Sequence, residues 1–162
     1  MIKTVLKYIV VKILEWEAKF VLRKYKPKII GITGSVGKTS VKDAVALILA
    51  TKFKTRKSEK SYNSELGVPL TILNRQTGWT SVTRWLENIL DGLALIVLPH
   101  DYPEWLVLEI GADRPGDIRK ICQWLKPNIA IITRLPEVPA HIEFFPSKES
   151  LIAEKAALAK SI

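Results

Sequence analysis

The apolar positions of the first segment repeat at alternating spacings of four and three residues, which is typical of an amphipathic helix. They are Ile2, Leu6, Ile9, Ile13, Trp16 and Phe20. Lysines occupy the other side of this helix, and Lys7 and Lys12 interrupt every apolar stretch that could cross a membrane. We therefore expect residues 1–27 to form a basic amphipathic helix. It either docks onto this protein or a partner, or makes a peripheral contact with a membrane surface.

Apolar runs and helical patterns alternate along the rest of the chain. Runs of the buried-strand type predict strands at residues 28–33, 105–110 and 128–133, and residues 53–55 are a candidate for a further short strand. Helical spacing predicts helices from the end of a glycine-rich turn to about residue 50, and at 79–98, 115–125 and 147–162. This alternation predicts an α/β fold with an open, mostly parallel sheet flanked by helices and preceded by the amphipathic helix. We expect residues 28–162 to form that single domain.

Composition is that of a soluble globular domain, with 48% hydrophobic and 25% charged residues in a chain of 162. It disfavours disordered, collagen-like and disulfide-rich classes. The only cysteine, Cys122, cannot form an internal disulfide, which fits a reducing compartment, and we expect a cytoplasmic protein. The net charge of +9 is concentrated in residues 1–28 and 52–60. Such patches suit phosphates or an anionic membrane surface, and we expect no nucleic acid partner.

A glycine-rich turn between the strand at 28–33 and the following helix carries the clearest chemical signal. Its residues are Gly34, Ser35, Val36, Gly37, Lys38, Thr39 and Ser40. Glycines let the backbone N–H groups and the helix N-terminus point at phosphate oxygens, while Lys38 adds a charge and Thr39 a hydroxyl for Mg²⁺. The long form of the phosphate-loop pattern is not satisfied, because Ile32 stands five positions before Gly37. The context of strand, turn and helix nevertheless predicts a site for the phosphates of ATP.

Five segments, in this order, resemble the Mur ligase family. They are T-G-S-V-G-K-T at 33–39, N-S-E-L-G-V-P-L-T at 63–71, L-E-I-G-A-D-R-P-G-D-I at 108–118, A-H-I-E at 140–143 and A-E-K-A at 153–156. The resemblance implies an ATP- and Mg²⁺-dependent ligase of cell-wall precursor synthesis that forms an amide bond through an acyl phosphate. It also implies two partners as substrates, a UDP-muramoyl peptide and an amino acid or dipeptide.

The resemblance further implies roles for individual residues. Lys38 and Thr39 would hold the β- and γ-phosphates and one metal ion, and Glu109 and His141 would bind metal. For Glu109 the residue pattern agrees, because ligand sites of open α/β sheets lie at the carboxyl ends of strands. A loop histidine such as His141 is otherwise more often merely exposed.

Two more residues complete the implied site. Asn63 would lie near the muramoyl substrate, although an asparagine there could simply turn the chain. Lys155 matches the lysine that many Mur ligases carry as a carbamate, so that Lys38, His141 and Lys155 form the implied catalytic set. The alternative for Lys155 is an ordinary salt bridge on a lysine-rich helix.

The sequence departs from the family pattern in three places. Arg134 replaces an asparagine, the family's separate N-terminal domain is absent, and nothing follows Ile162. We therefore expect either an incomplete ligase domain or a chain that acts with another chain. A nucleotide-binding module without catalysis, attached to a membrane or partner, is the alternative from another class, and a folylpolyglutamate synthase is the alternative among ligases.

Overall fold

The structure, a computed structural model, describes residues 2–59, 62–78, 81–136 and 142–162. Its elements in chain order are α1 (Ile2–Tyr25), β1 (Lys28–Thr33), α2 (Lys38–Ala50), β2 (Thr55–Lys57), α3 (Gly67–Leu73), α4 (Val82–Val97), β3 (Trp105–Glu109), α5 (Asp117–Cys122), β4 (Ile129–Ile132), the 3₁₀ turn η1 (Ile142–Phe144) and α6 (Lys148–Ala159).

A four-stranded parallel sheet lies at the centre, in the order β2-β3-β1-β4. In β1, Ile32 lies opposite Glu109 of β3 and Ile131 of β4. Because the strands are parallel, their carboxyl ends meet at one edge of the sheet. The predicted α/β class is confirmed.

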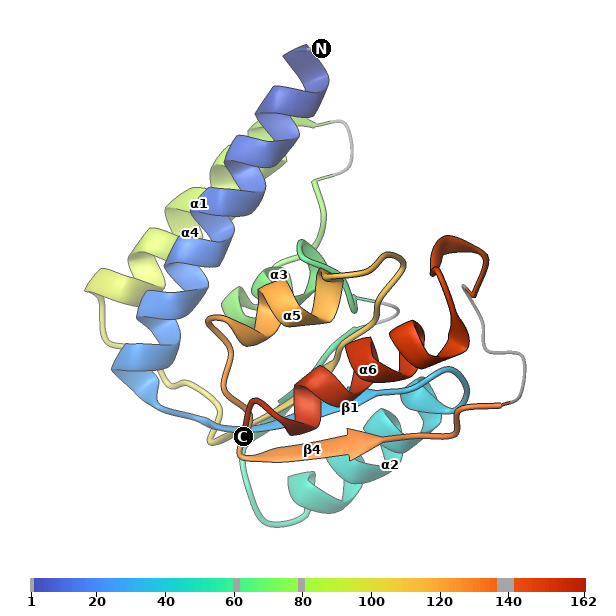
Figure 1. Cartoon of the computed structure of the whole chain (residues 1–162). Helices are drawn as coiled ribbons and strands as arrows, with labels where there is room; N and C mark the ends of the chain where they lie inside the picture. Colours follow the sequence, from blue (N-terminus) through green and yellow to red (C-terminus); the bar gives the residue numbers. More distant parts are fainter. Residues whose placement is uncertain (1, 60–61, 79–80, 137–141) are drawn as a thin grey trace.

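Helices cover both faces of this sheet, as the alternating pattern predicts (Figure 1). Helix α2 packs on one face, where Ile30, Ile32, Ala46 and Val107 form a small buried cluster. Helices α3 and α6 pack on the other face, α5 packs on α6, and their side chains join the main core. Burial on both faces explains why the sequences of the two central strands, β1 and β3, are mostly apolar rather than alternating.

Several element bounds differ from the prediction for local reasons. β2 begins at Thr55 rather than at residue 53, because the N–H of Phe53 still bonds to the carbonyl of Leu49 at the end of α2. Helix α5 begins only at Asp117, whose carboxylate accepts bonds from the backbone N–H groups of Asp113 and Arg114. Helix α3 was not predicted, and all seven of its residues are buried.

Helix α1 packs through a different face from the one that its sequence pattern indicates. Its buried face is formed by Leu14, Ala18 and Val21, which are fully buried in the core that α1 shares with α3 and α4. Much of the predicted apolar stripe is exposed, and the exposed members are Leu6, Ile9, Trp16 and Phe20. The helix is apolar on two faces, so its periodicity could not indicate which one packs. Docking onto this protein is therefore observed, whereas the domain boundary at residue 27 stays a prediction.

The described part of the chain contains no helix that is long and apolar enough to span a membrane. Helix α1 instead packs against α4, and a lysine of α1 binds the free carbonyl groups at the end of α4. The ammonium group of Lys24 donates to the carbonyls of Leu95 and Leu98, at 3.0 and 2.6 Å. A cation here stabilises the carbonyl end of a helix.

One carboxyl group is buried between these two helices. Glu17 is fully buried, and within the described residues neither of its carboxylate oxygens has a hydrogen-bond partner. A side chain at Gly92 of α4 would collide with this carboxylate, so the glycine provides its space. Burial raises the pKa of Glu17 from 4.5 to about 7.

We predict that Glu17→Gln stabilises the protein relative to the native chain as pH rises. The pKa of Glu17 is higher in the folded than in the unfolded state, so protonation of Glu17 stabilises the folded state. This stabilisation is complete below about pH 4.5 and is lost as pH rises through 7. The loss amounts to about 3 kcal/mol at most. Urea unfolding at about pH 5 and about pH 8 measures it. Glu15→Gln, which removes a partly exposed ion-pair partner of Lys12 and Lys19, is the control. Equal pH dependence of the native chain and Glu17→Gln would contradict the prediction.

Candidate functional site

The predicted phosphate loop connects the end of β1 to the start of α2. Gly34 has a φ of 141°, and a Cβ there would collide with the side chain of Thr133. Gly37 is the residue before α2 and has a φ of 86°, in the left-handed region. Both positions therefore favour glycine strongly. The N–H groups of the first turn of α2 have no partner within the helix, so they are available to an anion at the loop.

Arg134, the residue that departs from the family pattern, contacts this loop through its backbone. Its carbonyl accepts bonds from the N–H groups of Ser35 and Val36, at 3.2 and 3.3 Å. The contact joins the loop to the segment after β4 and fixes the loop's position. The N–H groups of Lys38, Thr39 and Ser40 at the helix start remain available for an anion.

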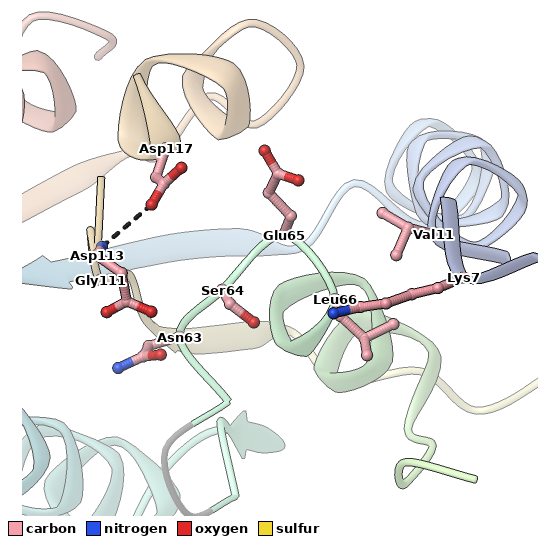
Figure 2. A pocket seen from close by; sticks show the side chains of 9 residues that line it. All are labelled: Lys7, Val11, Asn63, Ser64, Glu65, Leu66, Gly111, Asp113 and Asp117. Atoms are coloured by element: carbon pink, nitrogen blue, oxygen red, sulfur yellow. Dashed lines mark hydrogen bonds between the residues drawn. The ribbon is translucent and has the colours of Figure 1, made fainter. Parts of the chain in front are cut away.

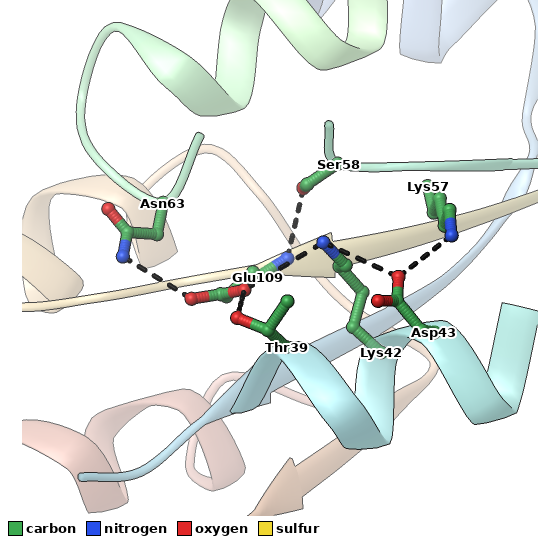
Figure 3. A network of polar contacts seen from close by, with 7 residues as sticks. All are labelled: Thr39, Lys42, Asp43, Lys57, Ser58, Asn63 and Glu109. Atoms are coloured by element: carbon green, nitrogen blue, oxygen red, sulfur yellow. Dashed lines mark hydrogen bonds and ion pairs between the residues drawn. The ribbon is translucent and has the colours of Figure 1, made fainter. Parts of the chain in front are cut away.

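Glu109 lies at the carboxyl end of β3 and is almost completely buried. Its Oε2 accepts a hydrogen bond from the hydroxyl of Thr39 at 3.0 Å, and its Oε1 lies 3.4 Å from the amide nitrogen of Asn63 (Figure 3). Three residues that are far apart in sequence thus converge at one point of the sheet edge. The hydroxyl and the carboxylate are hard oxygen ligands of the kind that Mg²⁺ prefers, so this pair fits a magnesium ion.

Two further residues of this network were not predicted. Lys42 is buried, and its ammonium nitrogen lies 4.0 Å from Oε2 of Glu109 and 3.6 Å from Asp43 (Figure 3). Ser58 accepts a bond from the backbone N–H of Glu109 at 3.1 Å. Signals for both exist in the sequence. Lys42 follows Thr39 by three residues on the same helix face, and Ser58 follows a strand, as Glu109 ends one.

Lys155 of α6 reaches the phosphate loop. Its ammonium nitrogen donates to the carbonyl of Gly34 at 2.9 Å, and the side chain is buried. Burial is the main cause that lowers the pKa of Lys155 to about 8, the charge of Lys38 acts in the same direction, and Asp113 opposes both. Among the described residues Lys155 forms no salt bridge, which disfavours the alternative of an ordinary surface pair.

Buried hydroxyl groups surround the same loop. Those of Thr33, Ser35 and Thr133 have no hydrogen-bond partner among the described residues. Thr33 ends β1 and Thr133 directly follows β4, so the two hydroxyls flank the loop at the sheet edge. Buried polar atoms are normally paired, so these three hydroxyls mark the loop as a place where polar groups are left without partners among the described residues.

Asn63 lies beside a cavity of about 190 Å³ that adjoins the Glu109 network (Figure 2). The backbone N–H of Gly111 donates to the carbonyl of Asn63 at 2.7 Å, and a Cβ at Gly111 would lie only 2.9 Å from the Asn63 amide. The glycine therefore permits this close approach. The cavity is lined by Lys7, Val11, Asn63, Ser64, Glu65, Leu66, Gly111, Asp113 and Asp117.

The third predicted metal ligand, His141, lies outside the described residues. Within the part of the chain that is described, no three His, Cys, Asp or Glu side chains gather closely enough to hold a metal ion. Among the described residues, Thr39 is therefore the oxygen ligand that stands beside Glu109 for a magnesium ion, which usually keeps several waters.

Residues 32–162 match the family model of the Mur ligase middle domain. This chain belongs to the Mur ligase family. Two similar curated proteins are UDP-N-acetylmuramoyl-tripeptide–D-alanyl-D-alanine ligases. The one from Borreliella burgdorferi is 32% identical over 149 residues, which cover 92% of this chain and 26% of that protein. The one from Rickettsia prowazekii is 32% identical over 136 residues, covering 84% of this chain and 24% of that protein.

Solved structures of Mur ligases agree with the fold. A MurF ligase from Thermotoga maritima in complex with ADP superimposes with a TM-score of 0.70 at 29% identity, and the match covers 93% of this chain and 29% of that one. A MurF from Acinetobacter baumannii, 23% identical, shows the same fold with a TM-score of 0.69, over 92% of this chain and 27% of that one. The chain thus spans about a quarter of the length of these Mur ligases.

We predict that Gly34→Ala destabilises this Mur ligase domain more than Gly37→Ala does. Both changes place a side chain at a positive φ, which costs about 1–2 kcal/mol. Only the Cβ at position 34 collides with Thr133, because the space around Gly37 is open. The free energy of unfolding in urea measures the difference, and equal losses in the two variants would contradict the close approach of Gly34 to Thr133.

Proposed function

We propose that the chain is the ATP-binding part of an amide ligase that adds D-alanyl-D-alanine to a UDP-N-acetylmuramoyl tripeptide. The observation that carries the proposal is the contact of Thr39 with the buried carboxylate of Glu109, directly beside a phosphate loop. The curated relatives named above carry this activity in their names. ADP in the related Thermotoga maritima structure supports ATP as the nucleotide.

The loop would bind the β- and γ-phosphates of ATP. Lys38 is half-buried and is the first residue of α2. Its charge and the N-terminus of the helix would therefore act on the same anion. Thr39 and Glu109 would hold Mg²⁺, with His141 as the family resemblance implies. When bound, the ion offsets the repulsion between the substrate carboxylate and the phosphates.

The proposed reaction has two steps. The carboxylate of the muramoyl peptide attacks the γ-phosphorus and releases ADP, which leaves an acyl phosphate. The amine of the dipeptide then attacks the acyl carbon and releases phosphate. Residues of this chain would position the first step, because the phosphate loop, Glu109 and the cavity beside Asn63 adjoin one another. Delivery of the amine would involve parts of the protein, or a partner, outside this chain.

Lys155 would contribute a negative charge after carbamylation, as in the family it resembles. Its pKa of about 8 supports this proposal, because the neutral amine, which reacts with carbon dioxide, is then populated near neutral pH. A carbamate would also exchange the like charges of Lys155 and Lys38 for an attractive pair. We place the reaction in the cytoplasm under the same proposal.

We predict that Lys38→Ala weakens ATP binding by at least about tenfold, since a charge-assisted contact to phosphate contributes about 1.5–3 kcal/mol. Isothermal calorimetry of the protein with ATP and Mg²⁺ measures the change. Lys52→Ala is the matched control, because Lys52 is an exposed lysine just beyond the opposite end of α2. Unchanged affinity of Lys38→Ala would show that the loop is only structural.

We also predict that Glu109→Gln removes most of the gain in ATP affinity that Mg²⁺ gives the native protein. The amide keeps the shape of the side chain but lacks the charge that a hard cation requires. Affinities measured with Mg²⁺ and with EDTA separate this effect from a loss of phosphate binding. Should Glu109→Gln respond to Mg²⁺ as strongly as the native protein, the metal assignment fails. Normal ATP binding without any ligase activity in the complete system would favour a non-catalytic nucleotide-binding module.

A further inference from the structure

Helix α4 has an exposed apolar stripe that the ligase proposal does not use. Its residues follow one another at spacings of four and three, and they are Val82, Leu86, Leu90, Leu93 and Val97. Their exposed fractions run from 38% for Leu93 to 75% for Val97. The opposite side of α4, with Asn88, Gly92 and Leu95, is buried on the side of α1 and α3. A contiguous exposed apolar surface of this kind marks an interaction site.

The exposed stripe of α1 faces the same side. Helices α1 and α4 run side by side in the same direction, as Glu17 lies against Gly92 and Lys24 bonds to Leu95 and Leu98 (Figure 1). Successive residues are rotated by about 100° around the axis of a helix. Given these contacts, both exposed stripes therefore lie on the side away from α3. Leu6, Ile9, Trp16 and Phe20 therefore continue the surface of α4. We call the exposed apolar side chains of these two stripes the α1–α4 face.

Basic residues lie along the α1 margin of this face. Lys19, Arg23, Lys26 and Lys126 line an open cavity of about 580 Å³ beside Trp124. Lys19 is paired with Glu15, while the guanidinium of Arg23 lies over the ring of Phe20, 5.7 Å from its centroid. None of the described residues that line this cavity is acidic. The cavity thus offers several positive charges next to exposed aromatic and aliphatic side chains.

We propose that the α1–α4 face lies on the surface of an anionic lipid bilayer, with the basic cavity at its margin over the lipid headgroups. Apolar side chains with tryptophan and phenylalanine enter the boundary between headgroups and acyl chains, and lysine and arginine attract anionic lipid. A second copy of the chain fits less well, because a two-fold contact through this face would bring like basic margins together. The proposal does not depend on the ligase activity.

Sedimentation of the protein with vesicles tests this proposal. Vesicles of equal parts phosphatidylglycerol and phosphatidylcholine should sediment the protein, vesicles of phosphatidylcholine alone should do so far less, and added salt should weaken the binding. The double variant Leu86→Gln/Leu90→Gln should lose at least about tenfold in affinity, because it lacks two leucine side chains whose transfer from water into the bilayer favours binding. Arg23→Gln and Lys126→Gln should each lose about fivefold.

Matched controls exist on α2. Leu47 and Ile48 are exposed by 73% and 69%, on the helix that covers the other face of the sheet. Leu47→Gln/Ile48→Gln should bind vesicles like the native protein, and Lys52→Gln should match it as the charge control. The substituted leucines and isoleucine are exposed, so each variant should remain folded. Thermal unfolding verifies this.

Three outcomes would overturn the proposal. The protein could fail to sediment with the anionic vesicles, or Leu86→Gln/Leu90→Gln could bind them as tightly as the native protein. In the third, the native protein binds neither kind of vesicle and is a dimer by sedimentation velocity, whereas the leucine variant is a monomer. That result would assign the face to a second copy of the chain.

Discussion

The parallel pairing of β1 with β3 is the constraint on which the rest of the site depends. It sets Ile32 opposite Glu109, so that the loop after β1 and the carboxylate that ends β3 lie at the same edge of the sheet. Helix α2 begins directly after that loop and brings the Thr39 hydroxyl to 3.0 Å from the carboxylate. A shift of one residue in this register would turn Glu109 to the other face and separate the pair.

The same edge concentrates polar groups that are costly to bury. Glu109, Lys42 and Lys155 are all nearly inaccessible to water, and three hydroxyls beside the phosphate loop lack partners among the described residues. Burial of charges and unpaired polar atoms opposes folding unless ligands or partners offset it. A bound nucleotide with its cation would supply both acceptors and charge at this edge. The arrangement is thus explained better by ligand binding than by stability.

Sequence patterns predicted the parts of the fold that depend on local regularity. The three main strands, the helix after the phosphate loop and the cap at Ser147 are observed, the cap by a bond from the N–H of Ser150. The convergence of Thr39 and Glu109 is a consequence of the parallel topology, which places the ends of β1 and β3 at one edge of the sheet. Helix α3 was missed because a buried seven-residue segment has no polar face to show a period. Which side of α1 packs could not be predicted, because that choice depends on α3 and α4 rather than on α1 itself.

The central claim is that Thr39 and Glu109 hold the metal of a bound nucleotide at the carboxyl edge of the sheet. A crystal structure of the protein with Mg²⁺ and a non-hydrolysable ATP analogue tests it most directly. We predict terminal phosphates in the loop between Gly34 and Ser40, near Lys38, and a magnesium ion in contact with Thr39 and Glu109. Nucleotide bound away from the loop, or a metal ion that contacts neither residue, would contradict the account.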